Sequence, residues 1–225
     1  MTLNHVRSQL FVPADDEDRL EATFTSGADA VVADLEDFVP PDRKDAARES
    51  VARLLPGLTG AARFVRVNAP ETGLLAADLE AIRDLPLDAV VLPKATVASV
   101  PAVSDLGLPV IAVIENAQGL REAYEIASAP AVAALGLGAG DLTLALRLET
   151  RPDALELLFA RSKLVVDSSA AGIRAPFDRV FPRLSDEAGL REDALFGRSL
   201  GFGGKSCTHE SQPAVVNEVF ASRPS

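Results

Sequence analysis

The sequence predicts an α/β protein that folds as a single (β/α)₈ barrel, the TIM-barrel architecture. Eight short apolar runs alternate with helical patterns along the whole chain, and polar residues follow several of the runs at the same end. With 225 residues, of which 48% are hydrophobic and 24% charged, the chain can build a large core. No linker or low-complexity segment divides it, so we expect one domain over residues 1–225. An open doubly wound sheet is the alternative, and it would leave some of the eight runs unexplained.

The predicted strands are short, rich in β-branched or aromatic residues, and mostly apolar on both faces, as buried parallel strands are. They span residues 9–13, 30–36, 63–68, 89–94, 110–115, 132–138, 176–181 and 201–206.

Helical patterns fill the intervals, and prolines or glycines bound several of them. The longest, residues 153–171, has an apolar stripe of the kind that faces a core. That stripe consists of Leu155, Leu158, Phe159, Val165 and Val166. The predicted helices span residues 18–26, 42–55, 72–84, 96–103, 118–128, 153–171, 186–200 and 211–222.

Composition excludes several classes of function. The 22 Lys and Arg against 33 Asp and Glu give a net charge of −11, which argues against nucleic acid or an anionic membrane as the main partner. One cysteine and two histidines exclude a disulfide framework, a zinc site of the CxxC type and a histidine-rich metal site. No signal peptide or membrane span is visible, so we expect a cytoplasmic protein.

The chemistry should lie where the strands end, because the reactive groups of such barrels sit at the carboxyl ends of the strands. Side-chain alternation places Arg66 and Asn68 on one face of their strand, and Glu115 on the face of Val113. If Val113 points into the barrel, Glu115 points into its mouth. The polar residues at these ends are Asp34, Glu36, Asp37, Arg66, Asn68, Lys94, Glu115, Asn116 and Asp141.

Two of these carboxylates, Glu115 and Asp141, follow neighbouring strands. With water and substrate oxygens they suit a hard divalent cation, above all Mg²⁺. Arg66 would supply a planar fork for a substrate carboxylate or for a developing oxyanion. The set therefore predicts a site for an α-keto acid or an enolate. The alternative is a group of structural ion pairs at the barrel end.

Other signals are weaker. The run 136–141 imitates a dinucleotide fingerprint but has Asp141 where the third glycine belongs, and 204–206 imitates the end of a P-loop whose first glycine is missing. Lys205 stays an anion candidate, Cys207 is expected in the core, and His209 is either a polar cap or a catalytic group. Arg7, Arg19 and Lys205 are candidates for holding an anionic thioester, with ordinary surface charge as the alternative.

Several motifs in order resemble the citrate lyase β-subunit (CitE-like) family of the HpcH/HpaI aldolase superfamily. The similarity covers nearly the whole chain, and the stretch Asp34-Leu35-Glu36-Asp37 with the downstream Arg66-Val67-Asn68 is its most specific part. The motifs are SQLFVP at 8–13, GADAVVADLED at 27–37, VRVN at 65–68, LPK at 92–94, VIEN at 113–116, GAGD at 138–141 and GFGGK at 201–205.

The resemblance implies a TIM barrel of the phosphoenolpyruvate/pyruvate type, assembled as a homotrimer or hexamer. It implies a Mg²⁺-dependent carbon–carbon lyase that acts on a 3-hydroxyacyl thioester such as citryl-, malyl- or citramalyl-CoA and releases an α-keto acid such as oxaloacetate. By position, Glu115 and Asp141 match the metal ligands, and Arg66 matches the arginine that holds the keto acid. Glu36 and Asp37 match acidic residues that hold metal-bound water and orient their neighbours, so the resemblance implies that they are catalytic together with Arg66. Lys94, in the matching LPK motif, is expected to bind substrate with Arg66 and Glu115.

The chain also departs from the family pattern. Ala14 stands where the family often has glycine, and 208–210 reads Thr-His-Glu where the family commonly has Ile-His-Pro. We expect no counterpart of the C-terminal lid segment that the malyl-CoA lyase branch has. We therefore weigh a keto-acid-binding subunit that needs a partner, or a thioester hydrolase, against the lyase.

Overall fold

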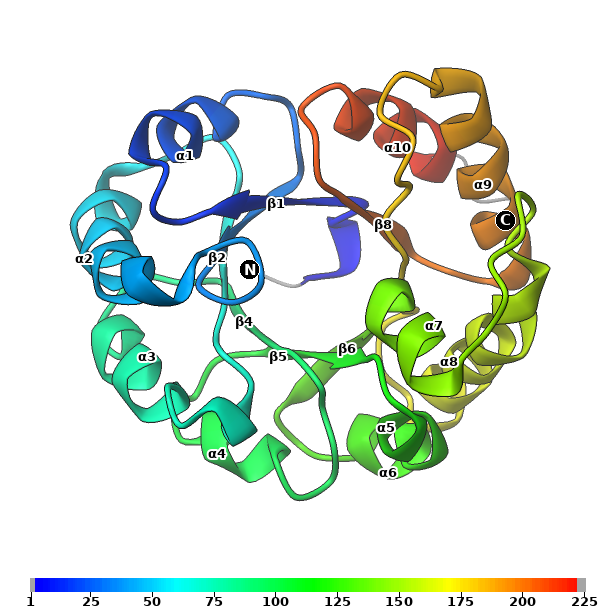
Figure 1. Ribbon diagram of the computed structural model, residues 1–225, viewed down its shortest axis with the longest axis horizontal. Coiled ribbons are helices and arrows are strands. Elements are labelled where there is room, and N and C mark those ends of the chain that lie inside the picture. Colours follow the sequence, from blue (N-terminus) through cyan, green and yellow to red (C-terminus); the bar gives the residue numbers. More distant parts are fainter. Residues whose placement is uncertain (1–2, 222–225) are drawn as a thin grey trace.

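The computed structural model describes residues 3–221 and has a closed barrel of eight parallel strands, in the order β1 to β8, inside a ring of helices (Figure 1). This confirms the predicted fold class. The strands are β1 Ser8–Pro13, β2 Ala30–Asp34, β3 Ala62–Arg66, β4 Ala89–Leu92, β5 Val110–Ile114, β6 Val132–Leu137, β7 Phe177–Asp178 and β8 Gly204–Cys207.

Each strand overlaps its predicted run, with the largest differences at the end of the chain. β7 has two residues where six were expected, and β8 begins at Gly204 instead of Gly201. Gly201 has φ +108° and ends the preceding helix in the left-handed region, which glycine adopts without strain. At Gly204 a side chain would collide with the backbone of Arg7, so this strand can approach the start of β1 closely.

Most of the helices agree with their predicted ranges. They are α1 Glu17–Thr23, α2 Lys44–Leu54, α3 Leu75–Ile82, α4 Val100–Ser104, α5 Ala117–Arg121, α6 Ala123–Ala127, α7 Ala139–Leu146, α8 Leu158–Ala170, α9 Glu187–Leu200 and α10 Gln212–Ala221. Short 3₁₀ turns accompany them: η1 Leu3–His5, η2 Pro41–Arg43, η3 Leu55–Gly57, η4 Pro70–Thr72 and η5 Leu155–Leu157.

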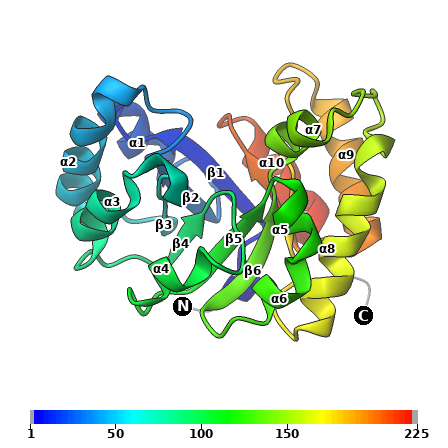
Figure 2. The ribbon, with the colours of Figure 1, turned by 60° about the horizontal axis from the view of Figure 1, so that its bottom comes forward.

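Three helix predictions need correction. The helix expected over 118–128 is two helices that meet at Glu122, and the one expected over 96–103 begins only at Val100. No helix was predicted at α7, which follows β6 after Gly138 and rises above the barrel rim (Figure 2). The expected end of the last helix, Ser222, lies outside the described residues.

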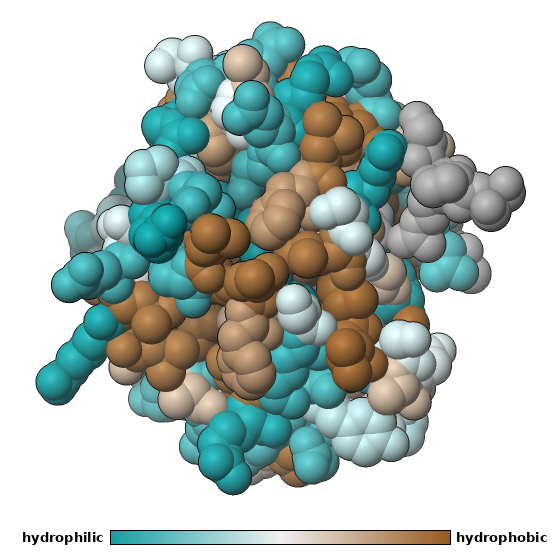
Figure 3. Space-filling model, turned by 90° about the vertical axis from the view of Figure 1, so that its right-hand side faces the viewer, coloured by the Kyte–Doolittle hydropathy of each residue, from teal (hydrophilic) through white to brown (hydrophobic). Residues whose placement is uncertain are grey.

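The core has two layers. Thirteen buried apolar side chains fill the barrel interior, and a larger set lies between the strands and the helices. Only Val165 of the apolar stripe predicted to face the core packs against it, and the other four residues of the stripe are exposed. Phe159 is 72% exposed and Val166 63%, whereas the buried face carries Ala160, Arg161 and Leu164. Apolar residues consequently gather on one outer face of the molecule (Figure 3).

No helix within residues 3–221 combines the length and the apolar character needed to cross a membrane.

Candidate active site

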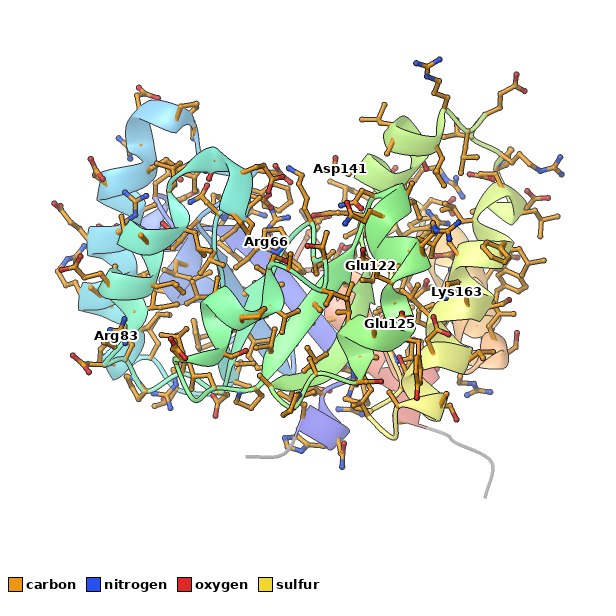
Figure 4. The ribbon with its side chains drawn as sticks, turned by 90° about the horizontal axis from the view of Figure 1, so that it is seen from below. Arg66, Arg83, Glu122, Glu125, Asp141 and Lys163 are labelled. Atoms are coloured by element: carbon orange, nitrogen blue, oxygen red, sulfur yellow. The ribbon has the colours of Figure 1, made fainter. Side chains whose placement is uncertain are left out.

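A cavity of about 220 Å³ lies at the carboxyl ends of the strands, and most of the predicted site residues surround it. Arg66 is the last residue of β3, Glu115 follows β5 directly, and Asp141 lies in the first turn of α7. Glu36 and Asp37 lie in the loop after β2. Figure 4 shows Arg66 within the barrel and Asp141 at its upper rim.

Arg66 is fixed by a two-pronged ion pair. Its Nε and Nη2 each donate to one oxygen of the buried Asp34 carboxylate, both at 2.6 Å. The Phe11 and Phe38 rings lie on its guanidinium, 5.2 and 5.3 Å from Cζ. Burial opposes the charge, but Asp34 and the nearby acids outweigh it and raise the pKa of Arg66. The guanidinium is therefore a permanent, oriented cation that keeps Nη1 directed at the remaining acids.

Glu36 lies next to Nη1, the third nitrogen of the Arg66 guanidinium. Its Oε2 is 3.0 Å from Arg66 Nη1, and its Oε1 is 3.4 Å from Lys94 Nζ. Burial raises the pKa of Glu36 to about 7, even though Arg66 works in the opposite direction. A carboxyl group with such a pKa can accept and return a proton near neutrality. Asp37 is more exposed and lies 3.3 Å from Arg66 Nη1.

Glu115 is held against the start of α7. Its Oε1 accepts a hydrogen bond from the Lys94 backbone N–H at 2.7 Å, and its Oε2 lies over the backbone of Gly138. Burial raises the pKa of Glu115 to about 8, and the negative charge of Glu36 is the second-largest cause of this rise. The close approach is possible because Gly138 has no side chain, which brings Glu115 to the helix turn that carries Asp141.

Lys94 connects the acids. Its Nζ is 3.7 Å from Asp141 Oδ2 and also pairs with Glu36. Its backbone has φ +48°, in the left-handed region, so the chain turns sharply after β4, where its N–H meets Glu115 and its ammonium group meets Glu36 and Asp141. Lys94 thus compensates part of the local negative charge.

The acids fit a divalent cation that keeps some of its ligands from water or substrate. Among residues 3–221 no three His, Cys, Asp or Glu side chains stand close enough to enclose an ion by themselves. Glu115 and Asp141 offer two oxygen ligands, with Glu36 nearby, and burial disfavours the negative charges of Glu115 and Glu36. Mg²⁺ is commonly bound through one or two carboxylates with several waters, so this donor set suits it.

The inner end of the cavity was not predicted. It is lined by Gln9, Phe11, Val113, Gly136 and Ser206, all inside the barrel. Gln9 and Phe11 are two residues apart and therefore share the interior face of β1. A polar residue two positions before an interior aromatic residue is the sequence signal that could have revealed this part of the cavity. Asp34, which orients Arg66, was noted at its strand end but was given no role.

Several candidates lie elsewhere. Asn68 is buried against Asp78 and Lys44, because β3 ends at Arg66 and its alternation stops there. Lys205 points outward from β8 and pairs with Asp178 and Asp193, so it is not an anion site at the mouth. Arg7 precedes β1, at the opposite end of the barrel, and pairs with Asp29.

Three further residues have no contact with the site acids in the structure. His209 is exposed and bonds to Ser211, as a polar cap would. Arg19 donates to the Thr208 carbonyl oxygen. Cys207 is fully buried, as predicted for a core residue, and burial raises its pKa to about 12.

The chain was compared with known proteins. The family model described as HpcH/HpaI aldolase/citrate lyase matches residues 7–210. A (3S)-malyl-CoA thioesterase of Cereibacter sphaeroides is 36% identical over 97% of this chain and 78% of its own length. The citrate lyase subunit beta of Escherichia coli is 35% identical over 96% of this chain and 76% of its own length.

Solved structures agree with the sequence relatives. The citrate lyase β subunit of Mycobacterium tuberculosis, complexed with oxaloacetate and magnesium, has a TM-score of 0.85 and 34% identity, covering 99% of this chain and all of the other. The same organism's CitE with magnesium, acetoacetate and coenzyme A has a TM-score of 0.83 and 36% identity over 97% of this chain and 81% of that one.

Proposed function

The chain belongs to the HpcH/HpaI aldolase/citrate lyase family, and from this premise we propose that it is a Mg²⁺-dependent carbon–carbon lyase of a 3-hydroxyacyl-CoA thioester. The product would be an α-keto acid, with an acyl-CoA as the second product. The observation that carries the proposal is the meeting of Glu115, Asp141 and the Arg66 fork around one cavity. The magnesium, oxaloacetate and coenzyme A bound to solved relatives support it.

Glu115 and Asp141 would hold the ion. When bound, it supplies Lewis-acid charge that polarises the oxygens of the keto acid. Arg66 Nη1 points into the same space and binds the keto-acid carboxylate or the oxygen on which charge develops. Because Asp34 already orients the guanidinium, little reorganisation is needed when substrate binds.

Glu36 is the candidate base. In the cleavage direction it takes the proton of the substrate 3-hydroxyl, the C–O bond becomes the carbonyl of the keto acid, and the C–C bond breaks. The electron pair passes to the α-carbon of the thioester, which leaves as its enolate and is then protonated. The pKa of about 7 at Glu36 suits a group that removes this proton near neutral pH.

A thioester hydrolase is the second candidate, and the 36% identical (3S)-malyl-CoA thioesterase favours it. The same acids could then position a water molecule for attack on the thioester carbonyl. The two reactions differ in their products. Hydrolysis releases free CoA thiol and a hydroxy acid, whereas the lyase releases a keto acid and keeps the thioester intact.

The proposal is tested first by calorimetry. Oxaloacetate, pyruvate and glyoxylate are titrated into the protein with Mg²⁺ and then with EDTA. We expect at least one keto acid to bind only with the metal. Glu115→Gln and Asp141→Asn should each abolish this binding, while Glu125→Gln, on the exposed face of α6, should leave it unchanged. Metal-dependent binding that survives both site variants would refute the assignment.

Turnover is then followed with citryl-, malyl- and citramalyl-CoA, with keto acid and free thiol measured separately. Keto acid without thiol establishes the lyase, and thiol without keto acid establishes the hydrolase. Binding with neither product would support a keto-acid-binding subunit that needs a partner.

We further propose that the protein is a homo-oligomer. The support is the apolar outer face on α8, which a second copy would cover.

A further inference from the structure

The inner end of the cavity carries one polar pair, Gln9 and Ser206, which the proposed chemistry does not use. Gln9 Nε2 donates to Ser206 Oγ at 2.9 Å, between the neighbouring strands β1 and β8. Gln9 is 1% exposed, and its Oε1 has no hydrogen-bond partner in the described part of the chain. An unsatisfied buried amide oxygen is unfavourable, so this pair awaits a hydrogen-bonding group.

The pair lies deeper in the barrel than the reactive groups. Gln9 is two residues before Phe11 on the same interior face of β1, and the Phe11 ring packs on Arg66. Two residues of strand place Gln9 about 7 Å from Phe11 along β1, on the side away from the mouth. A small molecule held at Arg66 and the carboxylates therefore directs its far substituent toward Gln9 and Ser206.

The pair can both donate and accept a hydrogen bond whichever way the Gln9 amide is turned. If Nε2 donates to Ser206, the Ser206 hydroxyl proton, the second N–H and Gln9 Oε1 remain free. If the amide is reversed, the Ser206 hydroxyl donates to Oε1, and both N–H groups and the Ser206 oxygen remain free. Each arrangement leaves at least one donor and one acceptor.

The surroundings of the pair are uncharged. Phe11, Val113 and Gly136 form the nearby walls, and every charged residue that lines the cavity follows a strand or ends one: Asp37, Arg66, Glu115 and Asp141. A carboxylate at this depth could accept a hydrogen bond from the pair but would face the free acceptor with no cation beside it. A methyl group would leave both polar groups unpaired. A hydroxyl group, which both donates and accepts, matches the pair.

We propose that Gln9 and Ser206 select the keto-acid substrate, favouring an α-keto acid that carries a hydroxyl on its third carbon over one that ends in a methyl or a carboxylate. This inference rests on the proposed function, because it takes the keto acid to be held by the metal ligands and Arg66. It assigns the two residues to substrate recognition, with no part in bond cleavage.

The test compares 3-hydroxypyruvate, pyruvate and oxaloacetate by calorimetry with Mg²⁺. We expect 3-hydroxypyruvate to bind about tenfold more tightly than pyruvate, which corresponds to one satisfied hydrogen-bonding group. Gln9→Met keeps an unbranched side chain of similar length without polar groups, and it should abolish that preference by weakening 3-hydroxypyruvate and not pyruvate. Ser206→Ala should reduce the preference as well.

Ser168→Ala is the matched control, since Ser168 is also buried but lies in α8, outside the cavity. It should leave the ratio of the two affinities unchanged. Equal binding of 3-hydroxypyruvate and pyruvate, or a preference that survives Gln9→Met, overturns the inference. If no keto acid binds with Mg²⁺ at all, the proposed function has failed instead, and the two failures are thereby distinguished.

Discussion

At the scale of single residues, the site depends on the absence of one side chain. A Cβ at Gly138 would lie 2.3 Å from Glu115 Oε2 and 2.5 Å from Glu115 Cβ. Gly138→Ala should therefore displace Glu115 from the start of α7 and weaken Mg²⁺-dependent keto-acid binding at least tenfold. Isothermal titration measures the affinity, and circular dichroism verifies that the barrel is still folded.

Gly140→Ala is the control for this substitution. Gly140 is two residues away in the first turn of α7, and a Cβ there meets nothing within 4 Å. Alanine also favours the helix, so this variant should be at least as stable as the parent. If both variants bind the keto acid normally, the close packing of Glu115 on Gly138 does not determine the site.

The single cysteine provides a test of the buried outer layer. Cys207 is fully buried on β8, and burial raises the pKa of its thiol to about 12, so the thiolate is scarce at neutral pH. We expect no reaction with Ellman's reagent in the native protein within minutes at pH 8, and stoichiometric reaction in denaturant. A rapid native reaction would show that the β8 region opens readily.

Residue chemistry and strand position together predict part of the site. Arg66, Glu115 and Asp141 were found because each lies at or just past the end of an apolar run, and the closed barrel brings those ends together. Gln9 and Ser206 meet because β1 pairs with β8, nearly two hundred residues away in the chain, and that register is not visible in either local sequence. Asn68 was misplaced because alternation was extended past the point where the strand ends.

At the scale of elements, β7 and β8 are stabilised by a buried ion cluster. β7 has two residues, yet its Asp178 pairs with Arg161 of α8 and Lys205 of β8, all three fully buried. Asp193 of α9 pairs with the same two cations and with Arg179. These ion pairs join two short strands to two long helices. They hold β7 in place, because a strand of two residues forms few backbone hydrogen bonds of its own.

This cluster predicts how stability depends on pH. Burial alone would raise the pKa of Asp193, but Lys205, Arg161 and Arg179 outweigh it and lower the pKa to about 2. A depressed folded-state pKa stabilises the protein above the unfolded-state value near 4, and this contribution is lost as the pH falls from about 4 toward 2. Asp193→Asn should reduce the free energy of unfolding by about 2 kcal/mol or more at pH 7.

Urea denaturation at pH 7 and at pH 3 measures this difference, which should shrink at the lower pH. Asp45→Asn is the control, because the Asp45 side chain is 92% exposed where it pairs with Arg48, and such pairs contribute little. An Asp193→Asn variant as stable as the parent at pH 7 would show that the cluster is not a net source of stability.

At the scale of the whole molecule, periodicity identified the apolar stripe of α8 but could not say what covers it. An amphipathic pattern shows only that one face of a helix is apolar. Either the core of the same chain or another subunit can bury that face. In the structure the face of α8 that meets the barrel carries Leu164 together with small and charged residues, including Arg161 of the ion cluster. Leu155, Leu158, Phe159 and Val166 of the stripe are left exposed, and Figure 3 shows apolar surface on the side of the molecule that carries α8 and α9.

This outer face gives the last prediction. Leu155, Phe159 and Val166 follow one side of the α8 region at helical spacing, with Leu195 of α9 also exposed on the neighbouring helix. Contiguous apolar surface of this kind is typical of subunit contacts, so light scattering should give a mass that is a multiple of 23.6 kDa. Phe159→Asp would bury a charge in such a contact and should shift the protein to the monomer. Leu184→Asp, at an exposed apolar position outside α8, should not. A parent protein that is monomeric at micromolar concentration would contradict the assembly. Every residue named for the cavity comes from one chain, so keto-acid binding should persist in the Phe159→Asp monomer.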